Sequence, residues 1–305
     1  MKTSSLGKGF IFAFLSYCLW GILPLFWHLL DKVDSLHILA FRILLSLLLV
    51  AVILVVQKNF VWVSVFRDPK KAMLLIPTAI ILCCNWGLYI WAVNKGHTLD
   101  ASLGYYINPL ISILLGLIFF RERLNPLQWV AVAIALAGVL ILTILSGTLP
   151  WISLSLALTF GFYGLLKKKI SLSALESLGA ETLASAPVGL ILLLFGFGNT
   201  LNSHIPVFTA WHGLAYLGEL PWQTWILLLL AGIVTATPLY LFARGAKLLP
   251  LSALGFTQFI SPTIQFVLGL FVFKEAFPKH HFAAFAIIWV AVIIYIVSLR
   301  VTRKD

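Results

Sequence analysis

The sequence predicts an all-α integral membrane fold with ten transmembrane helices in two inverted five-helix repeats. Three observations predict it: the composition, ten apolar stretches of spanning length, and a duplicated residue pattern. Of the 305 residues, 61% are hydrophobic and 10% are charged, whereas soluble domains are about half apolar and a quarter charged. Lipid must therefore be the main solvent. The net charge is +11, and the basic residues lie in short clusters between apolar runs. This distribution is typical of loops that set the orientation of a membrane protein and not of a nucleic-acid-binding surface.

Ten apolar stretches have about the 20 residues that a helix needs to cross the hydrocarbon core. Most connections between them are brief and carry Gly, Pro or charge, as loops between neighbouring spans do. The longer connection 198–222 fits an interfacial helix, a lid or a passive surface loop, and its role stays open. The stretches are 9–30, 35–56, 72–94, 99–120, 126–146, 150–166, 175–197, 223–243, 251–273 and 280–299.

The basic residues between these stretches predict the orientation of the chain, because Lys and Arg are retained on the cytoplasmic side. With the N-terminus inside, sixteen of the 21 Lys and Arg residues fall in cytoplasmic segments and four fall outside. The remaining one, Arg42, lies within a span. We therefore expect both termini and the Lys167–Lys169 loop in the cytoplasm, and residues 198–222 on the outer side.

A residue pattern in the fourth stretch recurs in the ninth at a constant offset. Ile107-Asn108-Pro109 and Arg121-Glu122 return as Ile260-Ser261-Pro262 and Lys274-Glu275, 153 positions later. Agreement over this length favours an internal duplication. Because the repeated unit holds five spans, an odd number, its second copy enters the membrane upside down, as in secondary carriers.

Polar and aromatic side chains inside the predicted spans are the candidate substrate-binding residues. In lipid such groups are unfavourable, so they should face the bundle interior or a wet cavity; hydrogen bonding between helices is the structural alternative. Two trios share the offset of 153 and the i, i+3, i+7 spacing of one helix face, and they are Tyr105, Asn108 and Ser112, and Gln258, Ser261 and Gln265. Further candidates on the interior faces are Tyr17, Trp20, Asn85, Tyr89, Tyr163 and Tyr240.

Two ionisable residues, Arg42 and Glu181, lie well inside predicted spans. A charge at a helix centre costs ~2.5–3.5 kcal/mol on insertion scales, so each needs a partner, a proton or water. Three hypotheses stay open: a mutual clamp, an anionic-substrate contact for Arg42, and proton coupling through Glu181. Glu122 and Glu275 are expected to remain in the interface, in exposed pairs of little individual worth.

The run from Ala101 to Leu110, together with Cys84-Asn85-Trp86 before it, resembles the EamA group of the drug/metabolite transporter superfamily. The resemblance covers nearly the whole chain, although 198–222 is longer than the family pattern. It implies two EamA-like five-helix repeats, which we place at 1–147 and 148–305.

The same resemblance implies a cavity formed mainly by spans 1–4 and 6–9, with spans 5 and 10 at the periphery. It also implies a permease or exporter of small metabolites or drugs in the bacterial inner membrane, working by alternating access. A chloramphenicol-resistance label is attached to some members of the family. Nothing in these residues selects chloramphenicol over an amino acid or another small amphipathic solute.

Two other functional classes are a membrane-embedded enzyme and a channel. An enzyme would need paired carboxylates, an activated nucleophile or a metal cluster, and a channel would need rings of charge or carbonyl loops; the sequence shows none of these patterns. Cys18, Cys83 and Cys84 lack metal-ligand spacing and are expected to be small buried hydrophobes. We expect no enzyme activity, cofactor or metal. The expected partners are a small-molecule substrate and the bilayer, without nucleic acid; the oligomeric state is not indicated.

Overall fold

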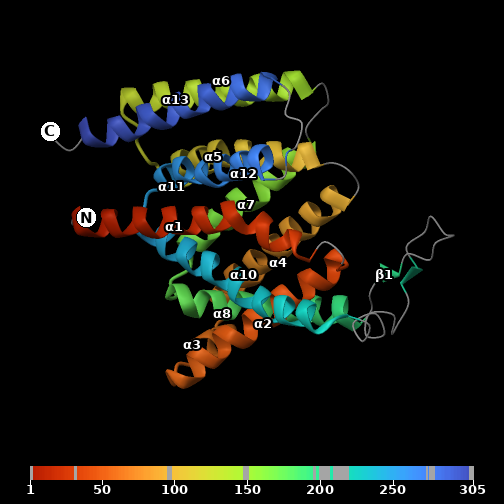
Figure 1. The fold of residues 1–305 in the computed structure, drawn as a ribbon. Helices are drawn as coiled ribbons and strands as arrows, with labels where there is room; N and C mark the ends of the chain where they lie inside the picture. The colour runs from red at the N-terminus through yellow and green to blue at the C-terminus, as the bar shows by residue number, and fades with distance from the viewer. Residues whose placement is uncertain are drawn as a thin grey trace. The chain divides into compact units, whose positions relative to one another are not determined.

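The computed structural model describes residues 3–30, 33–94, 98–146, 151–194, 197–198, 207–208, 220–272, 274 and 279–301, and within them it is helical almost throughout (Figure 1). The predicted all-α class is thus confirmed. The long helices overlap the predicted apolar stretches. They are α1 (Thr3–His28), α2 (Ser35–Val56), α4 (Pro69–Asn94), α5 (Thr98–Phe119), α6 (Pro126–Ser146), α7 (Trp151–Lys169), α8 (Ala174–Leu194), α10 (Trp222–Leu248) and α13 (Lys279–Val301).

Among the described residues, five helical segments are long and apolar enough to cross a membrane. They are Ser5–His28, Leu36–Val56, Pro69–Tyr89, Trp222–Leu248 and Leu251–Phe271. Shorter apolar helices cover Gly104–Phe119, Pro126–Ile141 and Ala286–Leu299. Ten spans in two inverted repeats remain a prediction.

The ninth predicted stretch is divided into two helices, α11 (Leu251–Gln258) and α12 (Ile260–Phe271), and not one as expected. The division falls at Phe259, three residues before Pro262. Proline has no N–H, so the carbonyl of Gln258 loses its usual donor four residues later. Pro109, at the equivalent position of the fourth stretch, lies inside the continuous helix α5.

Helix α2 begins with a side-chain cap. Asp34 Oδ1 accepts hydrogen bonds from the backbone N–H groups of Leu36 at 2.9 Å and His37 at 3.4 Å, which satisfies donors that the first helical turn leaves open. Partial burial alone would raise the pKa of Asp34, but hydrogen bonds from the His37 side chain and these amides hold it below its ordinary value.

Short elements occupy two of the predicted connections. Residues 57–71 contain α3 (Val61–Ser64) and the 3₁₀ helix η1 (Val65–Arg67), and they place Trp62 in a buried position. In the region expected as an interfacial helix, lid or loop, β1 (Phe197–Gly198) pairs with β2 (Val207–Phe208) in antiparallel register. Most of the remaining residues of 198–222 lie outside the described part of the chain.

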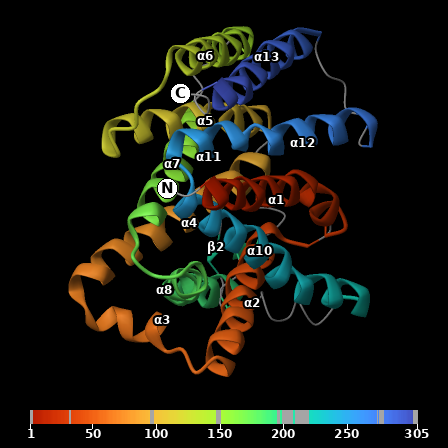
Figure 2. The same cartoon turned by 90° about the vertical axis from the view of Figure 1, so that its left-hand side faces the viewer.

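The chain forms two compact units, and each combines segments from both predicted repeats. Unit 1 comprises Met1–Ile22, Trp91–Leu165 and Arg244–Asp305, and unit 2 comprises Leu23–Ile90 and Leu166–Ala243. In unit 1, α6 packs along α13 and α5 packs against α11 and α12 (Figure 1). In unit 2, α8 packs along α2 and also contacts α3 (Figure 2).

In three of the predicted counterpart pairs, a helix packs on its counterpart from the other predicted repeat. The fifth predicted span packs on the tenth, the fourth on the ninth and the second on the seventh. The duplicated Arg-Glu and Lys-Glu motifs also share a backbone conformation, since Arg121 has a φ of 51° and Lys274 has a φ of 53°. Positive φ is uncommon for residues other than glycine, although Lys58, outside the duplicated motif, also has a φ of 54°. The duplication stays a prediction.

Helices α6 and α13 meet through small or apolar side chains and present large apolar ones outward. Ala131 and Ala135 of α6 and Ala291 of α13 are fully buried, whereas Trp129 and Ile293 are about half exposed. Small residues let two helices approach closely where lipid supplies no hydrophobic drive for association. The outward faces are therefore suited to contact with lipid.

Candidate functional site

The two predicted polar stripes of unit 1 contact each other directly. Gln258 Nε2 of α11 donates a 3.2 Å hydrogen bond to Ser112 Oγ of α5. Two turns earlier on α5, the hydroxyl of Tyr106 donates to the carbonyl oxygen of Pro262 at 3.2 Å. The first contact joins members of both trios.

These contacts define an antiparallel register between α5 and the α11–α12 pair. Asn108 thereby falls level with Ser261, and Tyr105 falls level with Gln265. The register follows the pseudo-twofold relation of the duplicated pattern, because the offset of 153 relates Tyr105 to Gln258 and Ser112 to Gln265. Gln265 Nε2 donates to Ser261 Oγ at 3.3 Å, so the α12 stripe is also linked along its own helix.

A glycine permits the close approach of these helices. A Cβ atom added to Gly255 would lie 2.7 Å from the carbonyl oxygen of Pro109, and it would also crowd Ile113 and Ser112. Such a contact is well inside van der Waals distance and involves backbone. The polar stripes are therefore in contact because residue 255 has no side chain.

Asn108 carries the clearest polar imbalance in this unit. The residue is only 7% exposed, and Oδ1 has no hydrogen-bond partner among the described residues. A buried acceptor left unsatisfied costs ~1–3 kcal/mol. Native proteins keep few such groups, and those that persist often belong to sites with a functional role.

An aromatic cluster borders the stripes in unit 1. The rings of Tyr17 and Trp20 lie 5.5 Å apart between centroids, Trp20 and Phe160 lie 5.6 Å apart, and Phe160 and Tyr163 lie 5.6 Å apart. Gln265 Nε2 also donates to the Trp20 carbonyl oxygen at 3.2 Å, and the Tyr17 phenol interacts with the side chain of Gln258.

Of this cluster, Phe160 was missed at the sequence level. Its position three residues before Tyr163, on the same helical face, is the signal that would have identified it. The cluster joins the candidate residues of α1 and α7 to those of α11 and α12.

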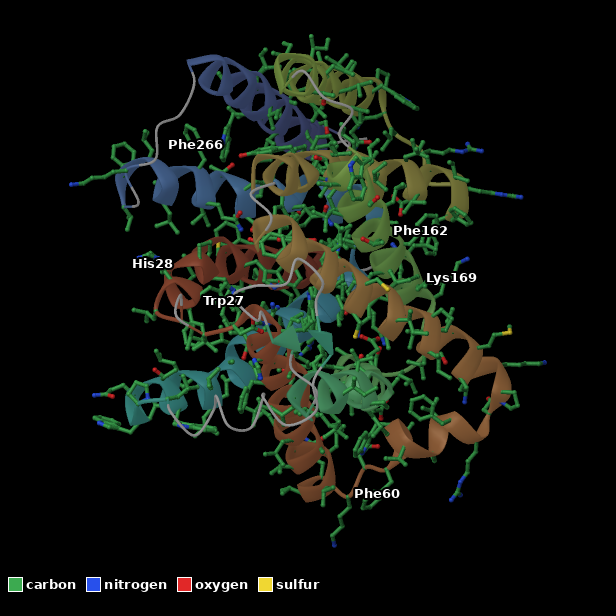
Figure 3. All side chains as sticks on the ribbon, turned by 90° about the vertical axis from the view of Figure 1, so that its right-hand side faces the viewer. Trp27, His28, Phe60, Phe162, Lys169 and Phe266 are labelled. Carbon is green, nitrogen blue, oxygen red and sulfur yellow. The ribbon has the colours of Figure 1, made fainter. Side chains whose placement is uncertain are left out.

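In unit 2, Arg42 is held by aromatic rings and a hydroxyl. Its guanidinium carbon lies 4.8 Å from the ring centroid of Trp27 and 4.5 Å from that of Trp86. Nε donates to Thr235 Oγ1 at 3.1 Å. Trp27 lies in the last turn of α1 (Figure 3), and the side chain of Arg42 is half-buried.

These contacts explain how a charged residue such as Arg42 can lie within a membrane span. A planar guanidinium stacks well on indole faces, and cation–π contacts contribute ~0.5–2 kcal/mol each, depending on desolvation. Trp27, Trp86 and Thr235 were not among the predicted site residues. Trp86 could have been identified because it follows the candidate Asn85 in the motif that resembles the EamA family. No sequence feature pointed to Trp27 or Thr235.

Glu181 has a different partner from the one the clamp hypothesis gave it. Both of its carboxylate oxygens lie 2.8 Å from Lys167 Nζ, and Ser177 Oγ donates to Oε1 at 2.8 Å. Lys167 and Glu181 are 0% and 1% exposed at their side chains. The predicted Arg42–Glu181 clamp is therefore wrong, and the buried ion pair joins α7 to α8.

The error came from where the sixth span was ended. We predicted residues 150–166 and placed Lys167–Lys169 in a loop, but α7 continues to Lys169. Successive helical positions point about 100° apart, so one lysine of three can face α8 while the next two turn away. Lys169, labelled at the end of α7 in Figure 3, is exposed.

The remaining candidates of unit 2 are Asn85, which is buried, and Tyr89 and Tyr240, which are half-buried. The structure thus sorts the fourteen predicted residues into two groups. Unit 1 holds Tyr17, Trp20, Tyr105, Asn108, Ser112, Tyr163, Gln258, Ser261 and Gln265, and unit 2 holds Arg42, Asn85, Tyr89, Glu181 and Tyr240.

Glu122 has a more specific role than the exposed pairing expected of it. Oε1 accepts from the backbone N–H of Leu251 at 2.6 Å, and Oε2 accepts from that of Ser252 at 2.9 Å. A residue 129 positions away thus caps the N-terminus of α11, where the helix dipole favours negative charge. Glu275 lies outside the described residues.

The described residues offer no group of three or more His, Cys, Asp or Glu side chains that could hold a metal ion. The three cysteines are free; Cys18 and Cys83 are half-buried, and Cys84 is exposed and not buried as expected.

Comparison with known proteins shows that the chain is similar to transporters. Residues 7–144 match the EamA-like transporter family. The chain is 42% identical to "Uncharacterized transporter YojE" of Bacillus subtilis, over 98% of this chain and 96% of that protein. It is 37% identical to "Protein RarD" of Escherichia coli, over 100% and 99%.

Two further likenesses extend the comparison. "Chloramphenicol-sensitive protein RarD" of Pseudomonas aeruginosa is 31% identical over 94% of this chain and 93% of that protein. A chain of known crystal structure superposes with a TM-score of 0.68 at 17% identity, covering 94% of this chain and 96% of the other. At that identity the superposition shows a shared fold alone.

Proposed function

Because the chain belongs to the EamA-like transporter family, together with the RarD proteins of the drug/metabolite transporter superfamily, we propose that it carries small amphipathic metabolites or drugs across the bacterial inner membrane by alternating access. The single observation that carries this proposal is the packing of three helices, α2, α5 and α6, on their counterparts from the second predicted repeat. Inverted repeats in secondary carriers place the substrate site where the repeats meet and allow two mirrored states.

The chemistry of the candidate residues supports an amphipathic solute. Unit 1 combines aromatic rings with amide and hydroxyl groups, and unit 2 presents a cationic guanidinium between indoles. Binding sites for small molecules commonly combine aromatic walls with a few polar groups that set orientation. In our proposal, Arg42 attracts solutes with a negative or strongly polar group.

Chloramphenicol is one candidate solute, because the printed name of the Pseudomonas aeruginosa relative associates that protein with sensitivity to it. The name gives neither the direction of transport nor the coupling ion. We therefore propose a permease or exporter without assigning chloramphenicol as its substrate.

A membrane-embedded enzyme is the second functional class, and we propose that the chain is not one. The relatives' printed names describe transporters. The two groups of candidate residues contain a single carboxylate, Glu181, and Lys167 and Ser177 occupy it.

We further propose two five-helix repeats over 1–147 and 148–305, with both termini in the cytoplasm. The basic residues of the chain support this orientation through the positive-inside rule. Accessibility of single cysteines to a membrane-impermeant reagent tests it. Labelling from outside at Ser203→Cys, and from inside at Lys169→Cys, is expected; the reverse pattern would overturn the orientation.

Reconstitution tests the transport proposal. Purified protein in proteoliposomes is expected to move some members of a metabolite and drug library, with and without a proton gradient. Trp20→Ala and Arg42→Gln should reduce transport of an accepted solute at least tenfold, while Trp129→Ala, on the exposed face of α6, should leave it unchanged. Equal rates in protein-containing and protein-free vesicles across the library would refute the proposal.

A further inference from the structure

The described cluster in unit 1 is rich in hydrogen-bond acceptors around Asn108. Oδ1 of Asn108 is buried and has no hydrogen-bond partner within the part of the chain that the structure describes. Ser261, level with it on α12, presents a hydroxyl oxygen that already accepts from Gln265. The carbonyl of Gln258 lies one turn away and has lost its usual intrahelical donor, because residue 262 is proline.

Aromatic rings adjoin the same helices. The chain of contacts from Tyr17 through Trp20 and Phe160 to Tyr163 is tied to this cluster by Gln265, which donates to the Trp20 carbonyl oxygen at 3.2 Å. Ring faces of Trp and Tyr attract cations as well as other rings. The surroundings of Asn108 therefore suit a group that donates hydrogen bonds and is attached to an apolar or aromatic body.

We propose that unit 1 recognises an arylalkylamine in its ammonium form, and that Asn108 Oδ1 accepts a hydrogen bond from the N–H of that ammonium group. The inference rests on the proposed transport function and names a substrate class for it. Asn108 is then a specificity-determining residue: it distinguishes an amine with N–H donors from a group of the same charge without them.

The unpaired acceptor at Asn108 determines which chemical group fits beside it. A carboxylate or nitro group placed at Asn108 Oδ1 would set lone pairs against lone pairs. An amine supplies the missing donor, and its positive charge is favoured by carbonyl dipoles and ring faces. A fully methylated ammonium keeps the charge but has no N–H, so it isolates the contribution of the hydrogen bond.

The test uses two ligands that share ring, chain and charge: 2-phenylethylamine and its N,N,N-trimethyl derivative. Dissociation constants are measured by calorimetry on the full-length protein in detergent at neutral pH. For the wild type, the primary amine should bind about tenfold or more tightly than the trimethyl compound, as expected for loss of a charge-assisted hydrogen bond.

Two substitutions at position 108 complete the design. Asn108→Leu keeps much of the volume and removes the acceptor, so the ratio of the two constants should fall to about one. Asn108→Asp keeps an acceptor oxygen and should preserve or increase the ratio. If Asn108→Leu fails to fold, the ratio of the two dissociation constants can still be compared between the wild type and Asn108→Asp.

Three results would overturn the inference. They are equal affinity of the wild type for both ligands, absence of binding to 2-phenylethylamine, and a ratio that survives in Asn108→Leu. The last would mean that Asn108 orders a structural water and does not contact the ligand. Failure of the transport proposal has a different signature, namely selective binding of the amine without movement of any solute in proteoliposomes.

Discussion

The ammonium of Lys167 and the carboxylate of Glu181 form a fully buried ion pair, with Nζ 2.8 Å from both carboxylate oxygens. Removing one charge leaves the other uncompensated, at a cost of about 3–5 kcal/mol. Lys167→Met and Glu181→Gln should each lower thermal stability in detergent, whereas the double variant should recover most of the loss. Lys169→Met, on the exposed side of the same turn, is the matched control. Additive losses in the double-mutant cycle would contradict a direct coupling.

Glu122→Gln should loosen the N-terminus of α11. The carboxylate accepts two backbone hydrogen bonds there, and a neutral amide can reproduce neither the charge nor both acceptors. We expect a loss of about 1–2 kcal/mol and faster amide exchange at Leu251 and Ser252 by mass spectrometry. Arg123→Gln, at an exposed position one residue beyond, should change neither; equal exchange in both variants would argue against the cap.

Gly255→Ala should force α5 and α11 apart. The new methyl group would meet the Pro109 carbonyl oxygen at 2.7 Å, and overpacking of this kind costs about 1–3 kcal/mol. Gly87→Ala is the control, because its added Cβ meets nothing within 4 Å and alanine is the better helix former. Melting temperatures of the two variants should therefore move in opposite directions. A stabilised Gly255→Ala would show that the contact is not tight.

Arg42→Lys should fail to replace arginine despite keeping the charge. An ammonium cannot stack as a plane between Trp27 and Trp86, and it has no equivalent of the Nε–H that reaches Thr235. We expect a loss of about 1–2 kcal/mol and altered tryptophan fluorescence. Arg244→Lys, where the guanidinium carbon lies 4.2 Å from the ring of Phe12, should have a smaller effect, because phenylalanine binds cations more weakly than tryptophan. A larger effect at Arg244 would contradict the double stacking.

Asp34 should add a pH-dependent term to stability. Its pKa is held below the ordinary value of 3.8 in the folded chain, so the stabilisation is fully present above that value and is lost as the pH falls below it toward the folded pKa. Asp34→Asn retains an N-cap side chain and should flatten this acid-side decline. Thermal unfolding between about pH 6 and pH 3 measures it; an unchanged slope would mean that other carboxylates dominate.

Some boundaries of the fold could be read from the sequence, and the reasons are local. The helices α2 (Ser35–Val56) and α6 (Pro126–Ser146) begin and end where predicted, because predominantly apolar runs are bounded there by polar residues or glycine. The break at Phe259 could not be read, since the equivalent proline in α5 does not interrupt its helix. Tertiary packing, and not proline alone, decides between a kink and a break.

The candidate site was predictable to the extent that it depends on helical periodicity. The spacing of Ser112 and Gln258 predicted that both face inward, and their direct contact is the hydrogen bonding between helices that was the structural alternative to a substrate-lining role. The partner of Glu181 was not anticipated, because a lysine after an apolar run was taken to mark the end of the span. A long-range ion pair can keep such a residue buried, and the sequence gives no local signal of the partner.

The packing of α2, α5 and α6 on their counterparts from the second predicted repeat has a consequence for biosynthesis. The first 147 residues are synthesised before α8, α11 and α13. Until those helices are inserted, the faces of α2, α5 and α6 that pack on them remain without these partners in the bilayer. Ser112 and Tyr106 of the early half bond to Gln258 and Pro262 in the folded chain, so they depend on transient partners, such as insertion factors or water, until the second half arrives. Two polypeptides divided after residue 147 and produced together should therefore find each other, whereas the first alone should be a substrate for membrane quality control.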